Sequence, residues 1–217
     1  MTLALASILA PFTFFVVAAS LQNVPGCLPG EKATIVSQSV FGDIPILSPG
    51  VGGVTNATIT FFTCPSRDSP VVAPPSTPID VCGLIDNSEP LFGEGTFNCT
   101  QGPTNEPTLA ECGIIDDMLQ DSFARTAEVV IPPRSGAVMS IFNNSCVFVF
   151  LNDDTNDTYS VCVGTISEMN TFTAEEECFS VAQDGFRGSY RSPVQPGVQN
   201  WEWHIAYAPD LDFDVGS

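Results

Sequence analysis

The sequence has few basic residues. Of 217 residues, 6 are Lys or Arg and 25 are Asp or Glu, which gives a formal net charge of -19 at pH 7. Such a chain repels DNA, RNA and anionic lipid, so we exclude nucleic acid as a partner. We expect the protein to be soluble at neutral pH, with calcium or basic surfaces as its natural counter-partners.

Catalytic motifs are missing as well. The chain has no Gly-x-Ser-x-Gly elbow, His-Glu-x-x-His helix, P-loop or dinucleotide-binding glycine pattern. Its single histidine, His204, directly follows Trp203, and we predict that it is exposed or structurally hydrogen-bonded. Most catalytic zinc sites need a second histidine. Whether the protein is an enzyme stays open, and we favour a non-catalytic role without a cofactor.

A Cys-x-x-Cys pair, which a zinc site or a thioredoxin-like centre would need, is also absent. The chain nevertheless has 8 cysteines, an even number spread along its length. This pattern predicts paired disulfides formed in an oxidising compartment. Spacing alone does not select the connectivity. The cysteines are Cys27, Cys64, Cys82, Cys99, Cys112, Cys146, Cys162 and Cys178.

Only one long apolar run is present. Residues 1–20 carry no charged side chain and end in the small residues that signal peptidase prefers. We predict a signal peptide cleaved after Ala19 or Ser20, with an uncleaved anchor as the alternative. Residues 21–217 are then expected to form a single secreted domain, extracellular and free of the membrane after cleavage.

Strand signals dominate the rest of the chain. β-Branched and aromatic residues gather in short segments separated by turn-forming residues. These segments are 33–40, 57–62, 137–142, 146–151, 159–164 and 201–207. Segment 146–151 is apolar at every position, so we predict that it lies inside a sheet, covered on both faces, as the middle strand of a meander with 137–142 and 159–164. The expected fold is mainly β, an antiparallel sandwich or barrel-like domain stapled by disulfides.

One α-helix is expected to pack on the sheet. Thr108 and Glu111 have capping-box spacing, and apolar residues recur at helical intervals over 109–124, so Cys112 would pin the helix to the sheet. A second Thr-x-x-Glu box at 173–176 could start a short helix.

Proline gathers in one stretch of the chain. Five prolines between residues 65 and 78 exclude a helix or an inner strand and predict a surface loop, with a linker as the alternative.

Four Asn-x-Ser/Thr sequons predict N-glycosylation in an exported chain. They are Asn56, Asn98, Asn143 and Asn156. Cys99 is the middle residue of the sequon at Asn98, and an early disulfide there could block the modification.

Two further groups of residues could form sites. Trp201, Glu202 and Trp203 could contact a sugar; alternatively, both indoles fill the core and Glu202 points into water. Three acids, Asp153, Asp154 and Asp157, lie close together in the turn after segment 146–151 and could bind calcium, or the turn is simply solvated. Asp210, Asp212 and Asp214 alternate in the C-terminal segment and could offer a second such cluster, but we expect them to form a frayed acidic tail.

These observations predict a secreted, acidic, glycosylated interaction or surface protein without catalytic activity, which would bind an extracellular protein or a polysaccharide. Two alternatives stay open. The first is a carbohydrate-binding or carboxylate-dependent carbohydrate-active protein that uses Trp201, Glu202 and Trp203. The second is a purely structural secreted protein.

Overall fold

The structure is a computed structural model. It describes residues 20–22, 24, 27, 30–45, 54–64, 78–80, 96–102, 107–121, 128–141, 145–154, 156–162, 164–166, 178, 185–192, 201–207 and 212–214. Several predictions therefore lie outside the described residues. They are the signal segment 1–19, the proline-rich stretch 65–77, the capping box at 173–176, Cys82 and Asn143.

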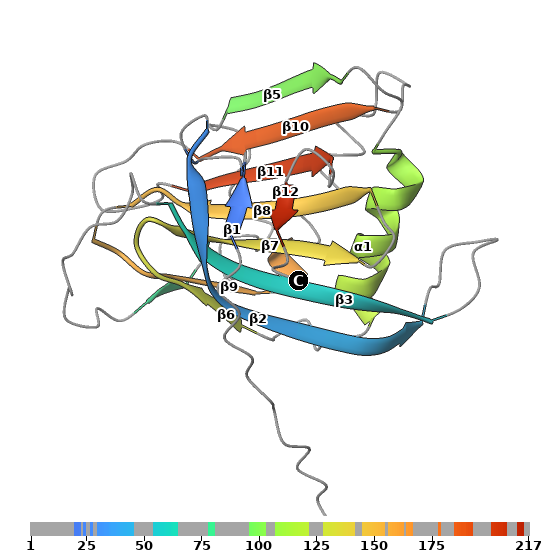
Figure 1. The fold of residues 1–217 in the computed structure, drawn as a ribbon, viewed down its shortest axis with the longest axis horizontal. Helices are drawn as coiled ribbons and strands as arrows, with labels where there is room; N and C mark the ends of the chain where they lie inside the picture. The colour runs from blue at the N-terminus through green and yellow to red at the C-terminus, as the bar shows by residue number, and fades with distance from the viewer. Residues whose placement is uncertain are drawn as a thin grey trace, which may run out of the picture.

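A nine-stranded sheet organises the described part of the chain, with every neighbouring pair antiparallel and the order β12-β1-β2-β3-β7-β8-β11-β10-β5 (Figure 1). Its strands are β1 (Ser20–Gln22), β2 (Lys32–Pro45), β3 (Val54–Thr63), β5 (Thr96–Gln101), β7 (Ser135–Ile141), β8 (Cys146–Asn152), β10 (Phe186–Arg191), β11 (Trp201–Tyr207) and β12 (Asp212–Asp214). The predicted mainly antiparallel β fold is confirmed.

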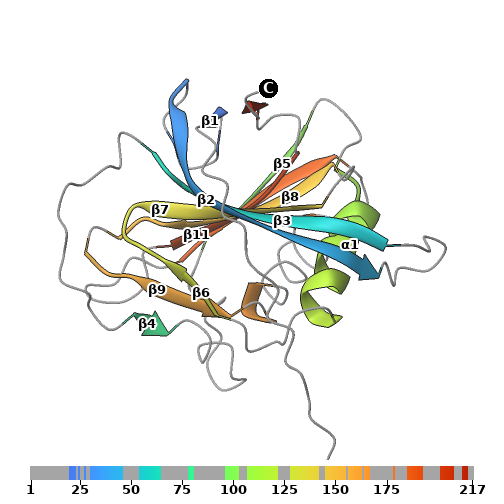
Figure 2. The same cartoon turned by 60° about the horizontal axis from the view of Figure 1, so that its bottom comes forward.

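A second layer covers one face of this sheet, which we call the inner face (Figure 2). It consists of a small sheet of order β4-β9-β6 and of the helix α1. Their bounds are β4 (Ile79–Asp80), β6 (Glu128–Ile131), β9 (Tyr159–Cys162) and α1 (Leu109–Asp121). On the opposite, outer face, the end of the sheet that carries β1 and β12 curls over the central strands (Figure 2).

Strand β8 lies at the centre of the core. All seven of its residues are buried, as the unbroken apolar pattern predicted. Phe148 and Phe150 belong to the inner-face cluster with residues of α1 and the small sheet. Val147 and Val149 belong to a separate outer-face cluster. β8 therefore contributes apolar side chains to the core on both faces of the sheet. Burying one such side chain stabilises a fold by about 1.5–3 kcal/mol.

The predicted meander is wrong in its third strand. β8 pairs with β7 and β11, whereas β9 pairs with β4 and β6 in the small sheet. The amide of Asn152 accounts for this departure. Its Nδ2 donates hydrogen bonds to the carbonyls of Ile131 and Pro132 at the end of β6, and of Asp157 in the turn before β9. These bonds direct the chain out of the main sheet.

The acidic C-terminal segment is also ordered differently from the expectation. β12 pairs with β1 in the register Ser20↔Asp214 and Gln22↔Asp212. A frayed tail over these residues was therefore the wrong prediction, because the alternating acids sit in a strand whose backbone is paired.

Three disulfides crosslink the described residues. They join Cys27 to Cys64, Cys99 to Cys178 and Cys112 to Cys146. Cys162 is disulfide-bonded as well, and no cysteine in the described part of the chain is free. The prediction of paired sulfurs is thus confirmed for these residues.

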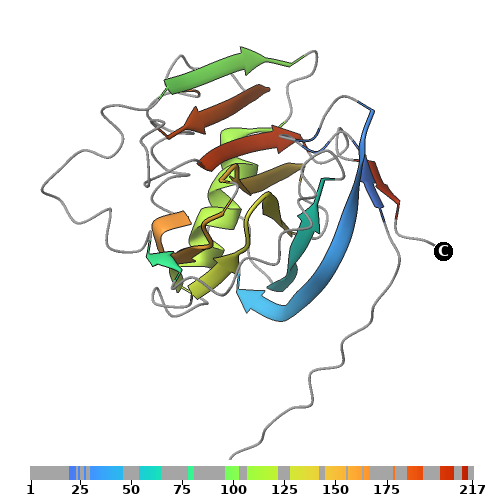
Figure 3. The same cartoon turned by 90° about the vertical axis from the view of Figure 1, so that its left-hand side faces the viewer.

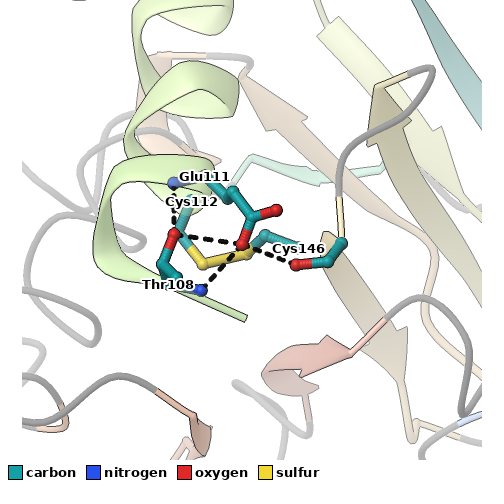
Figure 4. Close-up of a disulfide and its surroundings, with 5 residues drawn as sticks. Thr108, Glu111, Cys112 and Cys146 are labelled. Atoms are coloured by element: carbon teal, nitrogen blue, oxygen red, sulfur yellow. Dashed lines mark hydrogen bonds between the residues drawn. A yellow bond between two sulfur atoms is a disulfide. The ribbon is translucent and has the colours of Figure 1, made fainter. Parts of the chain in front are cut away.

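The helix begins at its predicted cap. The Glu111 N–H donates to Thr108 Oγ1 at 3.2 Å, and the Thr108 N–H donates to Glu111 Oε2 at 2.9 Å, which is a capping box. The disulfide between Cys112 and Cys146 holds the first turn against β8, and Ser145 Oγ donates to Glu111 Oε2 at 2.6 Å (Figure 4). The described helix ends at Asp121, three residues before the predicted end at residue 124.

These contacts shift the titration of Glu111. Partial burial alone would raise the pKa of its carboxyl, but hydrogen bonds from Ser145 and Thr108 outweigh burial and hold the pKa below the ordinary value. Because the folded-state pKa is lowered, the stabilisation is fully present above the ordinary value of 4.5 and is lost as the pH falls through the lowered native value.

Glu111→Gln should therefore lower the free energy of unfolding by about 0.5–1 kcal/mol at neutral pH. The difference from wild type should shrink as the pH falls below 4.5. Urea unfolding of both proteins between pH 7 and pH 3 measures it, and comparing the two proteins cancels the change in overall charge repulsion. A difference that stays constant over this range would contradict the assignment.

Candidate functional site

The two tryptophans of β11 lie in the inner-face core. Trp201 is 2% exposed and Trp203 is fully buried. The Trp203 ring packs edge-on against Phe148 at 5.3 Å between centroids, and Trp201 stacks on Phe150 at 5.8 Å. Rings in this position have no open face for a sugar to stack on. Their placement argues against the predicted sugar contact and supports the core alternative.

Glu202 projects to the outer face, but it does not point into water. Only 7% of the residue is exposed, so that part of the core alternative is wrong. One carboxylate oxygen pairs with the guanidinium of Arg191, which lies opposite Glu202 on β10. The other oxygen lies 2.9 Å from Nε2 of His204. The prediction that His204 is structurally hydrogen-bonded is confirmed.

This arrangement limits the chemistry of the cluster formed by Arg191, Glu202 and His204. A glycosidase acid must donate a proton to the leaving group, whereas both oxygens of Glu202 are engaged by partners from β10 and β11. The cluster therefore has a structural role, in which the ion pair between Arg191 and Glu202 joins β10 to β11.

Asp154, in the acidic turn after β8, accepts hydrogen bonds from the backbone of that turn. Asp154 Oδ1 accepts hydrogen bonds from the N–H groups of Asn156 and Asp157 at 2.8 and 3.0 Å. Asn152 Oδ1 accepts from the Asp154 N–H at 2.9 Å. These bonds connect two side chains of the turn to its own backbone.

The carboxylates of that turn do not converge. Among the described residues, only Cys27, Glu31 and Cys64 bring three potential metal ligands within 4.8 Å of one another. Two of these three share a disulfide, so their sulfurs are already committed. The geometry gives no support to the predicted calcium site at Asp153, Asp154 and Asp157.

The sequon asparagines inside the described residues are exposed. Asn56 lies on β3, Asn98 on β5 and Asn156 in the turn after β8. Exposure is what a glycan requires, and glycosylation itself stays a prediction.

Strand β2 has a long side without a neighbouring strand in the described part of the chain. Its neighbour β3 pairs with it from Thr34 to Pro45, but β1 pairs only with residues 32–34. The segment 35–45 therefore has no strand on its other side among the described residues (Figures 1 and 3). A free strand side presents backbone N–H and C=O groups that can pair with another chain.

The side chains and the register of this segment add to its openness. Val36 is 58% exposed and Val40 is 65% exposed, which makes them the two most exposed large apolar residues of the described chain. Between 35 and 45 the only charged residue is Asp43. Register shifts at 35–37 and 41–44 leave the five residues Ser37–Phe41 as a regular stretch. We call residues 35–45 of β2 the open edge.

The open edge was not among the residues predicted from the sequence. A strand over 33–40 was predicted, and the uncharged stretch between Lys32 and Asp43 was a readable signal. Its position at a rim of the sheet depends on the strand order, which the sequence does not reveal.

No helix in the described residues is both long and apolar enough to cross a membrane. No protein-family model matches the chain, and neither the curated proteins nor the solved structures contain a significant match.

Proposed function

We propose that the protein is exported and non-catalytic, and that it binds a basic, extended segment of a partner protein along the open edge of β2. The observation that carries this proposal is the open edge itself, which combines an unpaired strand side with two exposed valines. Strand addition of this kind obtains affinity from main-chain hydrogen bonds and specificity from alternate side chains.

Export is supported by the crosslinks. Every cysteine in the described residues is disulfide-bonded, and disulfides persist mainly in oxidising compartments. β1 begins at Ser20. Cleavage of the signal peptide after Ala19 would therefore leave β1 whole, whereas cleavage after Ser20 would remove a paired residue, so we favour Ala19.

The charge of the molecule supports a basic partner. The chain carries a formal charge of -19, so an approaching basic segment is attracted and an acidic one is repelled. The open edge itself has a single charge, Asp43. Electrostatics would thus speed the encounter and select the partner, while the backbone ladder over Ser37–Phe41 holds it.

A non-catalytic role is supported by the placement of the candidate catalytic group. Glu202 is buried and engaged by Arg191 and His204, and the neighbouring indoles lie on the other face of the sheet. This placement counts against the carbohydrate-active alternative, which used Trp201, Glu202 and Trp203.

A synthetic probe tests the proposal. We expect a peptide of alternating lysine and valine to bind the protein and to slow amide hydrogen exchange at Ser37–Phe41. Val40→Lys, which adds a charge to the edge, should weaken binding about tenfold, or 1.4 kcal/mol. Val130→Lys is the matched control, because Val130 is also an exposed valine, at 48%, but lies on β6.

Two further peptides separate the contributions. The same peptide with glutamate in place of lysine should not bind, and N-methylation of alternate backbone amides should abolish binding by removing the ladder. The proposal would be contradicted if Val40→Lys and Val130→Lys weakened peptide binding equally, or if the peptide slowed amide exchange outside the open edge.

A further inference from the structure

β5 is the last strand of the main sheet, at the end opposite to β12 and β1 (Figure 1). It pairs with β10 along its whole length, and no strand among the described residues pairs with its other side. Natural edge strands are usually protected by lysine, proline, a bulge or a covering segment. The sequence of β5, Thr-Phe-Asn-Cys-Thr-Gln, has no charge and no proline, and its pairing with β10 shows no register shift.

A sequon lies in the middle of this strand. Asn98 and Thr100 are exposed, while Cys99 between them packs partly buried against the inner-face core. Asn98 lies opposite Ser189 of β10, so its side chain stands on the outer face at the rim of the sheet. A glycan is bulky and hydrated. At this position it would occupy the space that a second strand needs to approach β5.

The disulfide of Cys99 forms late in synthesis. Cys99 is bonded to Cys178, which follows it by 79 residues. At about 5–20 residues per second, Cys178 is made roughly 4–16 s after Cys99. During this time the native bridge cannot exist, and Asn98 remains in an extended chain that a glycosylating enzyme can reach. The native disulfide of Cys99 therefore forms too late to prevent glycosylation of Asn98.

We propose that Asn98 carries an N-linked glycan and that this glycan closes the β5 edge to other strands. The inference rests on the proposed export, because N-glycans are added only in the secretory pathway. It makes two unpaired strand sides of the sheet unequal: the outer side of β5 is capped, and the open edge of β2 is available to a partner.

Four proteins made in a eukaryotic secretory host test the inference: wild type, Asn98→Gln, Thr100→Ala and Asn56→Gln. Thr100→Ala destroys the sequon but keeps the asparagine, and Asn56→Gln removes a sequon from β3 instead. Glycopeptide mass spectrometry should find Asn98 occupied in wild type. Sedimentation velocity should show self-association about tenfold tighter in Asn98→Gln and Thr100→Ala than in wild type, with Asn56→Gln unchanged.

A second measurement covers variants that fail to leave the cell. Trimming the glycans of the folded wild-type protein to a single sugar should produce the same increase in self-association.

Cys178→Ser tests whether Asn98 is glycosylated before the disulfide of Cys99 forms. The fraction of Asn98 that carries a glycan should equal that of wild type. If the glycosylated fraction of Asn98 is low in wild type and higher in Cys178→Ser, then the disulfide of Cys99 forms before glycosylation and the proposed order is wrong.

The outcomes distinguish this inference from the proposed function. Retention of the wild-type chain inside the cell overturns export and the inference together. Export with an unmodified Asn98 overturns the inference alone. An occupied Asn98 with wild-type behaviour in both sequon variants and in the trimmed protein overturns the capping role.

Discussion

Replacement of Trp203 by alanine should lower the free energy of unfolding by about 3–5 kcal/mol. The side chain is fully buried, and its ring packs against Phe148 at 5.3 Å and Phe150 at 6.4 Å between centroids. The substitution removes this apolar contact and leaves a cavity between the main sheet and the second layer, which close-packed neighbours fill only in part.

Trp203→Phe is the matched control. It keeps an aromatic ring in contact with β8, and it also removes an indole N–H that is buried without a hydrogen-bond partner among the described residues. Its cost should be less than half that of the alanine variant. Urea unfolding followed by far-UV circular dichroism measures both. A loss below about 1 kcal/mol for Trp203→Ala would mean that β11 does not turn its indoles into the core.

Removal of the bridge between helix and sheet should have a comparable effect. The double variant Cys112→Ala/Cys146→Ala opens a crosslink that spans 34 residues. Opening the crosslink raises the conformational entropy of the unfolded chain, which predicts a destabilisation of about 3–4 kcal/mol for such a span. Both sulfurs are buried, so their replacement by alanine exposes no polar group.

A second double variant isolates the docking of the helix. Cys27→Ala/Cys64→Ala opens a crosslink of 37 residues, nearly the same span, away from α1. Both variants should lose about the same free energy of unfolding, but only the first should speed hydrogen exchange in residues 109–121. Unchanged exchange there in Cys112→Ala/Cys146→Ala would show that packing alone holds the helix.

Local signals were sufficient to predict several elements of the fold. The unbroken apolar pattern of β8, the alternation of β11 and the capping box at Thr108 each involve residues near one another in the chain, and each prediction agrees with the structure. Alternation also placed the faces of β11 correctly, with Trp201 and Trp203 together and Glu202 opposite.

Properties that depend on distant residues could not be predicted in the same way. The pairing of the buried Glu202 with Arg191 requires the neighbouring strand β10. The transfer of β9 to the small sheet depends on hydrogen bonds from Asn152 to residues about twenty positions earlier. Alternation separates two faces of a strand, but it does not tell which face is covered.

The same limit applies to the open edge and to the disulfides. Whether β2 has one neighbour or two along residues 35–45 follows from the order of nine strands, and cysteine spacing selects no connectivity. The uncharged sequence of β2 indicates a strand, and only the topology indicates that its side is free.

The count of cysteines indicates how the remaining sulfurs pair. Three bridges account for six of the 8 cysteines. Cys162 is disulfide-bonded as well, so we expect the fourth bridge to join Cys162 to Cys82.

The proposed role requires a crosslinked sheet in a protein that leaves the cell. Non-reducing peptide mass mapping of the protein recovered from the medium of a eukaryotic host measures both properties at once. We expect an amino terminus at Ser20 and four linked pairs, Cys27 with Cys64, Cys82 with Cys162, Cys99 with Cys178 and Cys112 with Cys146. A chain found only inside the cell with Met1 in place, or with most of these sulfurs as free thiols, would contradict it.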